Sequence, residues 1–133
     1  MTSVTLHVLR KRADFLRLNR GRRFSAPGLV LQTAQTPDAP GDTTSVRVGL
    51  TVTKKIGNAV VRNKNRRRLR EAARQVLPLA GRAGHDYVLI ARQTTSNRSF
   101  EELKSDLRRG LEMVHKAKKP KPAKPMNSGE GVK

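Results

Sequence analysis

A chain of 133 residues is long enough for one domain with a modest hydrophobic core and too short for two such domains. Its formal net charge of +19 predicts a polyanionic partner, either nucleic acid or an anionic membrane. The absence of cysteine excludes disulfides, thiol nucleophiles and cysteine-bound zinc. No apolar run approaches the roughly 18 residues of a membrane span, and the opening MTSVTLHVLRKR lacks the apolar core of a signal peptide, so we expect a cytoplasmic protein.

The N-terminal part of the chain is polar and basic. We expect residues 1–9 to form a flexible N-terminus. A short helix is predicted at residues 13–20, with Phe15 and Leu18 on one side and Gly21 at its end. This helix and the residues after it carry a basic cluster, Arg17, Arg20, Arg22 and Arg23, which alone is also typical of a solubilising surface.

Two strands are predicted next, at residues 28–34 and 45–53, because both segments are rich in strand-forming side chains. The segment between them has the proline, glycine and aspartate content of a mobile loop, so the two strands are a hairpin candidate. Alternation in the second strand gives a core face of Val46, Val48, Leu50 and Val52 and an opposite face of Arg47, Gly49, Thr51, Thr53 and Lys55. The opposite face could hold an extended ligand or be an ordinary solvent face.

Residues 54–77 hold nine Lys or Arg and one acid, Glu71. Asn58 can cap the start of a helix by accepting hydrogen bonds from free backbone N–H groups, and Pro78 marks the predicted end. At about 100° per residue, two neighbouring arcs of side chains form on this helix. The core arc contains Val61, Asn65, Leu69, Ala72 and Val76, and the basic arc contains Arg62, Asn63, Arg66, Arg67, Arg70 and Arg74.

The basic arc indicates a nucleic-acid partner in preference to a solvated charged face. Like charges three and four residues apart destabilise a helix by about a few tenths of a kcal/mol per pair, and bound phosphates would relieve this repulsion. Arginine dominates the arc, and its planar guanidinium matches phosphate oxygens better than the lysine ammonium does.

The remaining segments predict structural elements. Residues 86–92 read as a central strand and residues 94–98 as a loop. Ser99 and Glu102 form a capping box that begins a helix reaching about Lys116. The lysine- and proline-rich residues 118–133 are expected to be disordered. The predicted order is α-β-β-α-β-α, and no catalytic constellation or metal-ligand spacing is present, since His7, His85 and His115 are widely separated.

Residues 54–71, KKIGNAVVRNKNRRRLRE, resemble the protein subunit of bacterial ribonuclease P, and so long a match to the family pattern is specific. The resemblance extends to KRADF at residues 11–15, to RVGLTVT at residues 47–53, to residues 86–92 and to the last helix, and so covers roughly residues 10–116. It implies an α+β fold, a small two-layer α/β sandwich of the ribosomal-protein-S5-domain-2-like type, with a left-handed crossover between the second and third strands. The domain is expected at residues 10–117.

The same resemblance implies a function. The protein would bind the catalytic RNA of ribonuclease P and the single-stranded 5′ leader of precursor tRNA, while the RNA, with Mg²⁺, cleaves the leader. No cofactor held by the protein alone, no catalytic residue and no protein or membrane partner are expected. The residues expected to contact the catalytic RNA are Lys54, Asn58, Arg62, Asn63, Lys64, Arg66, Arg67 and Arg70. The residues expected to contact the leader are Phe15, Gln32, Thr51, Thr53, Lys55 and Arg92.

Three residues depart from the family pattern. Asn19 and Gln32 stand where many members carry aromatic residues, so leader binding should depend on charge and hydroxyl contacts more than on stacking. Asn65 replaces an aliphatic residue, which predicts either weaker helix packing or a position facing RNA. The alternative function is a structural RNA-binding protein of the ribosomal type without a substrate site, and sequence-specific DNA binding is less favoured because the helix has too many consecutive arginines.

Overall fold

The computed structural model describes residues 5–37, 39, 41 and 43–116, which form one five-stranded sheet and three α-helices. The elements are β1 (Thr5–Val8), α1 (Arg12–Asn19), β2 (Arg22–Ser25), β3 (Leu29–Gln35), β4 (Ser45–Thr51), α2 (Ala59–Ala80), β5 (His85–Ala91) and α3 (Phe100–His115). Two short 3₁₀ helices, η1 (Lys54–Ile56) and η2 (Gln93–Asn97), follow β4 and β5.

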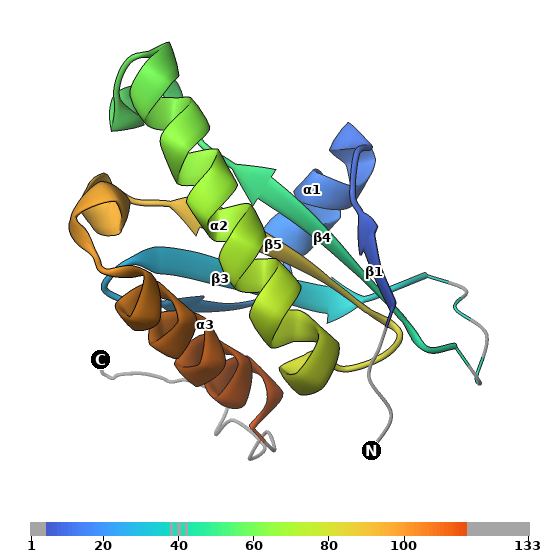
Figure 1. The fold of residues 1–133 in the computed structure, drawn as a ribbon. Helices are drawn as coiled ribbons and strands as arrows, with labels where there is room; N and C mark the ends of the chain where they lie inside the picture. The colour runs from blue at the N-terminus through green and yellow to red at the C-terminus, as the bar shows by residue number, and fades with distance from the viewer. Residues whose placement is uncertain (1–4, 38, 40, 42, 117–133) are drawn as a thin grey trace, which may run out of the picture.

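The strands lie in the order β1-β4-β5-β3-β2. The β1–β4 and β4–β5 pairs are parallel, and the β3–β5 and β2–β3 pairs are antiparallel. In Figure 1, α2 lies in front of the sheet and, seen along the strand direction, β5 lies to the left of β4. The β4–α2–β5 connection is therefore left-handed, against the usual preference for right-handed crossovers.

The helices cover both faces of the sheet (Figure 1). The main core lies under α2 and α3 and includes Leu31, Val46 and Leu89 of the sheet with Leu69 and Leu107 of the helices, all fully buried. On the opposite face, which we call the α1 face, a smaller cluster joins Leu9, Leu18 and Val88. The expected α+β fold is confirmed. The expected two-layer sandwich does not include α1, which packs on the second face of the sheet.

The prediction of a flexible N-terminus is wrong for residues 5–9. Thr5–Val8 is the edge strand β1, the backbone N–H of Leu9 donates to the carbonyl of Val48 at 2.8 Å, and Leu9 is buried. The local pattern is too short and polar to show this strand, because its partner β4 lies far along the chain. Strand β2 was not predicted either, because its sequence RRFS is short and polar, although its partner β3 follows directly.

The predicted hairpin of the strands at residues 28–34 and 45–53 is also wrong. These strands are β3 and β4, and β5 lies between them and forms hydrogen bonds to both. Strand β4 ends at Thr51, so Thr53 and Lys55 lie beyond the sheet, in and before η1. The turn into α2 uses Gly57, whose φ of +150° is accessible to glycine.

Helix α2 begins where predicted and ends later than predicted. The side chain of Asn58 accepts a hydrogen bond from the backbone N–H of Val61 at 3.0 Å, which confirms the cap. Pro78 lies inside the last turn and the helix continues to Ala80, since a proline there removes only one helical N–H donor. The capping box of Ser99 and Glu102 is present at the start of α3. The tail predicted at residues 118–133 lies outside the described residues.

Candidate nucleic-acid interface

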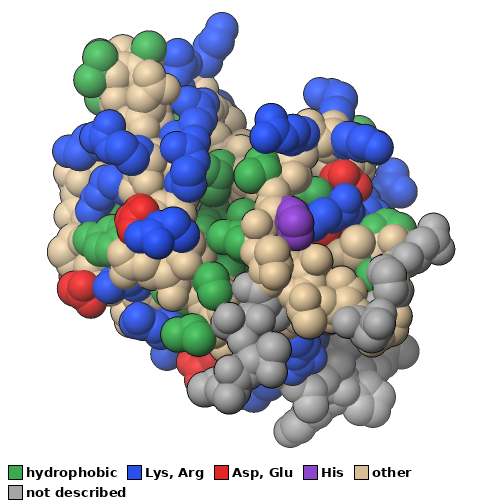
Figure 2. Space-filling view, turned by 45° about the vertical axis from the view of Figure 1, so that its right-hand side comes forward, with side chains coloured by type: hydrophobic (Ala, Val, Ile, Leu, Met, Phe, Trp, Pro, Cys, Tyr) green, Lys and Arg blue, Asp and Glu red, His purple; other side chains and the backbone are tan. Residues whose placement is uncertain are grey.

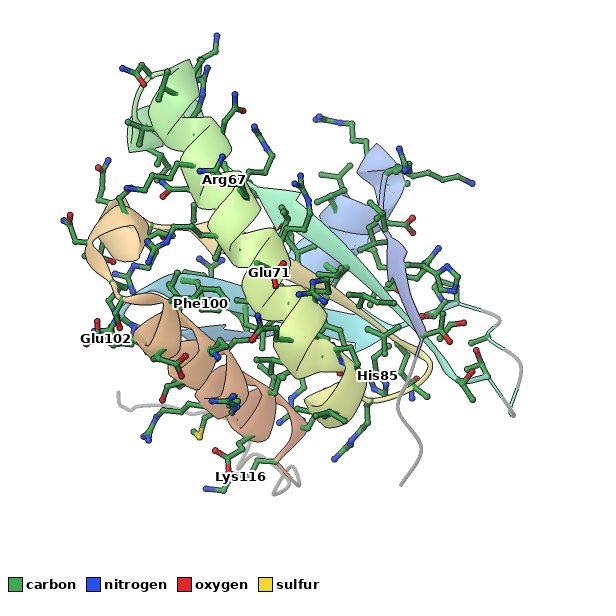
Figure 3. All side chains as sticks on the ribbon, viewed as in Figure 1. Arg67, Glu71, His85, Phe100, Glu102 and Lys116 are labelled. Atoms are coloured by element: carbon green, nitrogen blue, oxygen red, sulfur yellow. The ribbon has the colours of Figure 1, made fainter. Side chains whose placement is uncertain are left out.

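Helix α2 separates its two arcs as the sequence predicts. Asn65, Leu69, Ala72 and Val76 of the core arc are buried against the sheet. The basic arc stays at the surface, with Arg67 and Arg70 exposed and Arg62 and Arg66 half-buried. In Figure 3, the labelled Arg67 and Glu71 mark two successive turns of this exposed side. The arc therefore presents a row of guanidinium groups along the helix.

Acidic side chains neutralise little of this arc. The half-buried Glu71 pairs with Arg74, and hydrogen bonds from Arg74 and Gln75 lower the pKa of Glu71 to about 2. Within the part of the chain that the structure describes, no carboxylate lies within ion-pair distance of Arg62, Arg66, Arg67 or Arg70. These four cations are available for an anionic ligand.

Three of the residues predicted to contact RNA have hydrogen-bond partners within the protein. The Asn58 amide caps α2, and the Asn63 side-chain oxygen accepts a hydrogen bond from Nη1 of Arg66 at 2.9 Å. Lys54 and Lys64 are exposed at the N-terminal end of α2. Arg68, which the sequence analysis left outside the basic arc, turns inward and donates to the carbonyls of Thr95 and Arg98.

A hollow lies between α2 and the edge strand β1, and we call it the β1–α2 hollow. It has a volume of about 370 Å³ and is lined by Leu6, His7, Val8, Leu9, Phe15, Val48, Leu50, Arg66, Arg70, Ala73 and Arg74. Figure 2 shows apolar side chains exposed in a recess between two basic areas of the surface. Three members of the basic arc thus border an open apolar floor, which the helical arcs alone did not predict.

On the α1 face, the structure places Phe15 against the sheet. Phe15 is half-buried with Leu9 and Leu18 in the smaller core cluster. Gly49 makes room for it, because a Cβ at Gly49 would lie 2.5 Å from the Cζ of Phe15. Phe15 is therefore partly core, with only part of its ring left for a ligand.

The polar residues predicted on this face are only partly brought together. Thr51 is half-buried at the end of β4, and Thr53 and Lys55 are exposed beyond it. The side chain of Gln93 donates to the Lys55 carbonyl at 2.6 Å and so joins the segments after β4 and β5. The exposed Arg92, next to Gln93, donates to the carbonyl of Ala26 at 2.7 Å.

The prediction for Gln32 and the RNA-facing alternative for Asn65 need correction. Gln32 is 2% exposed and its amide donates to the Asn19 side-chain oxygen at 3.0 Å, so it supports α1 and presents no surface to a leader. Asn65 is fully buried and its side-chain oxygen accepts a hydrogen bond from Ser96 at 2.8 Å. Asn65 therefore joins α2 to η2 inside the fold and does not face RNA.

A buried ion-pair network, missed in the sequence, fixes α1 on the sheet. The fully buried Asp86 of β5 accepts hydrogen bonds from Arg17 of α1, from Thr36 and, through both carboxylate oxygens, from Arg47 of β4. Asp14 of α1 pairs with the same two arginines. The only signal in the sequence was an acid at the start of an otherwise apolar strand.

A second hollow, of about 790 Å³, lies at the C-terminal ends of α2 and α3, away from the basic arc. Its lining includes Arg82, Arg108, Arg109 and Lys116, and Arg82 donates to the backbone carbonyl of His115. Among the described residues, no three His, Asp or Glu side chains lie close enough to hold a metal ion. None of the described helices has both the length and the apolar character needed to cross a membrane.

Comparison with known proteins gives one consistent result. The sequence profile of the family Ribonuclease P matches residues 5–115. The ribonuclease P protein component of Ruegeria pomeroyi is 53% identical over 114 residues, covering 85% of this chain and 90% of its own. The ribonuclease P protein component of Paramagnetospirillum magneticum is 47% identical over 126 residues, covering 90% of this chain and 95% of its own. The structure of the Staphylococcus aureus ribonuclease P protein at 2.0 Å matches with a TM-score of 0.66 and 28% identity over 82% of this chain and 95% of that one. The structure of the ribonuclease P protein from Thermotoga maritima matches with a TM-score of 0.62 and 25% identity, covering 85% of this chain and 99% of that one.

Proposed function

Because the chain belongs to the ribonuclease P protein family, we propose that the basic arc of α2 binds the RNA subunit of ribonuclease P and that the α1 face binds the 5′ leader of precursor tRNA. Family membership makes the chain a protein component of this endoribonuclease, and the RNA subunit is its partner. We infer that the RNA, with Mg²⁺ held by RNA phosphates, carries out the cleavage, and that the protein supplies affinity for both RNAs.

The observation that supports RNA binding most directly is the row of guanidinium groups at Arg62, Arg66, Arg67 and Arg70, none of which has a carboxylate within ion-pair distance among the described residues. Each phosphate that such a group contacts releases condensed counterions, which favours binding without sequence readout. Guanidinium groups also form paired hydrogen bonds to phosphate oxygens. Lys54 and Lys64 extend this surface at the start of the helix, where the positive end of the helix dipole also favours an anion.

The proposed leader site lies at the end of the α1 face, beside the half-buried Phe15. Thr51 and Thr53 supply hydroxyl groups, and Lys55 and Arg92 supply charge. Asn19 and Gln32 form a hydrogen bond with each other, and neither has an aromatic ring on which a base could stack. The leader would therefore be held mainly by contacts to its backbone, which predicts weak dependence on leader sequence.

The experiment that tests this proposal compares two ligands of the reconstituted protein–RNA complex. Precursor tRNA with a leader of several nucleotides should bind more tightly than mature tRNA, and the protein should increase this ratio over that of the RNA subunit alone. A protein that assembles with the RNA yet leaves the ratio unchanged has only the structural role of a ribosomal-type RNA-binding protein. Failure to assemble with the RNA would overturn the proposal for the basic arc.

A further inference from the structure

The β1–α2 hollow combines two surfaces that a phosphate contact alone does not need together. One side carries Arg66, Arg70 and Arg74, and the floor carries apolar side chains from β1, β4 and α2 (Figure 2). Among the floor residues, Val8 is 62% exposed and Leu6 and Leu50 are half-buried, so water reaches apolar surface directly beside guanidinium groups. Covering this surface would be favourable, and the cover has to tolerate three neighbouring cations.

A nucleotide matches both surfaces. Its base is a flat, largely apolar ring system that can pack on Val8 and Leu50 and stack on a guanidinium plane. Its phosphate carries the negative charge that can pair with the cations Arg66 and Arg70. The volume of about 370 Å³ is within the range of small-ligand pockets and too small for a duplex. Only a nucleotide whose base is unpaired and turned out of its stack can enter.

We propose that the β1–α2 hollow takes one unpaired base of the RNA whose phosphates contact the basic arc. The proposal rests on the proposed function, because that RNA is already placed on α2 by Arg66 and Arg70. It adds a base contact, made by the apolar floor between β1 and α2, to the charge contacts of the helix. Phe15 borders this hollow and also belongs to the proposed leader site, whose other residues Thr51, Lys55 and Arg92 do not line the hollow.

A substitution that fills the hollow tests the proposal. Val8→Trp places a large side chain over the floor from an exposed position, so the fold should be kept. Loss of one stacked base should weaken binding of the RNA subunit by about 5- to 150-fold. The dependence of affinity on salt should stay as in the wild type, because no cation is removed. Leu79→Trp is the matched control, since Leu79 is 70% exposed and does not line the hollow.

A second measurement identifies the base. The chain has no cysteine, so Val8→Cys gives a single thiol for a short photoreactive probe. Cross-linking in the assembled complex should label one unpaired nucleotide, and removing the base of that nucleotide should weaken binding by the same factor as Val8→Trp. Combining the abasic RNA with Val8→Trp should cause no further loss, because both changes remove one contact.

The outcomes separate this inference from the proposed function. If Val8→Trp binds the RNA as tightly as wild type, or if its effect and that of the abasic nucleotide add fully, no base occupies the hollow, while the role of the basic arc still stands. If cross-links spread over paired regions, the floor meets RNA without taking a base, and the inference is again wrong. If the wild-type protein does not bind the RNA subunit, the proposed function itself fails.

Discussion

Arg17 of α1 and Asp86 of β5 form an ion pair across the α1 face, and this pair joins the first helix to the sheet. The Asp86 carboxylate is fully buried, and Arg47 binds both of its oxygens, at 2.8 and 2.6 Å. Burial alone would raise the pKa of Asp86, but hydrogen bonds from Arg47, Thr36 and Arg17 outweigh it and lower the pKa below its ordinary value. The proposed leader site depends on this network because α1 carries Phe15.

Asp86→Asn should destabilise the protein by about 3–5 kcal/mol, since it leaves two partly buried guanidinium groups without their shared carboxylate. Urea unfolding at neutral pH measures this loss. Glu102→Gln, on the exposed first turn of α3, is the control, and its effect should be much smaller. Equal stability of the two variants would mean that the network does not hold α1 in place.

Acid should also destabilise the fold through His115. Burial lowers the pKa of His115 to about 4, helped by the charges of Arg82, His85 and Arg22, and its Nε2 lies 2.5 Å from the Tyr87 hydroxyl. The unfolded chain binds a proton near pH 6.5 and the folded chain only near pH 4, so stability is lost as the pH falls through this window. The loss should be at most about 3 kcal/mol, because His115 is only partly buried.

The test is a series of urea unfolding curves from pH 7 to pH 4. His115→Gln cannot bind the proton, so its stability should change less than that of wild type over this range. Parallel pH profiles for the two proteins would assign the acid sensitivity to other groups.

The triple variant Arg62→Ala, Arg66→Ala and Arg70→Ala should assemble more weakly with the RNA subunit. The slope of log affinity against log salt should fall by about 0.7–0.9 for each lost phosphate contact, or by roughly 2–3 for all three. The fold should survive, because these side chains lie at the surface of α2. A charge-matched variant with alanine at Arg108, Arg109 and Lys116 controls for net charge. Equal slopes for the two triple variants would show that charge matters and the position of the arc does not.

Lys55 and Lys54 offer a paired test of the two RNA sites. Lys55→Ala should lower the affinity for precursor tRNA relative to mature tRNA, by about 2- to 5-fold for one exposed charge contact. Lys54→Ala should weaken assembly with the RNA subunit and leave that ratio unchanged. Both side chains are exposed in η1, so neither change should alter the unfolding midpoint. The same ratio in both variants would remove the assignment of Lys55 to the leader.

Gly49→Ala should destabilise the protein by about 1–3 kcal/mol, because its Cβ would meet the Phe15 ring at 2.5 Å. In a Phe15→Ala background the same change should have little effect, since the clashing ring is absent. A double-mutant cycle by urea unfolding measures this coupling. Additive effects would place Phe15 away from Gly49 in solution.

Features encoded by neighbouring residues could be predicted from the sequence. The cap at Asn58, the capping box at Ser99 and Glu102, and the division of α2 into two arcs each depend on residues within one or two helical turns. These signals located α2 and α3, and the motif at residues 54–71 indicated the family. The basic arc, which is the stronger part of the site, was predicted for this reason.

Features that depend on distant partners could not be predicted. Strand β1 is visible only through its pairing with β4, and the hairpin prediction failed because β5 inserts between β3 and β4. The helical arcs left Arg68 outside the basic arc, but they did not predict that it donates to the distant carbonyls of Thr95 and Arg98. Gln32 was placed on the correct face, yet its burial under Asn19 could not be inferred from alternation alone.

The central place of β5 in the sheet determines when this chain can fold. Strands β3 and β4 have no hydrogen bonds to each other, and each depends on β5, which follows them in the chain. During synthesis, the cationic helix α2 leaves the ribosome before the sheet that buries its core arc can close. Assembly of the sheet therefore waits for residue 91, and long-range pairing of this kind slows folding. Until then the arginines of α2 can already attract RNA, so folding and the first RNA contact overlap in time.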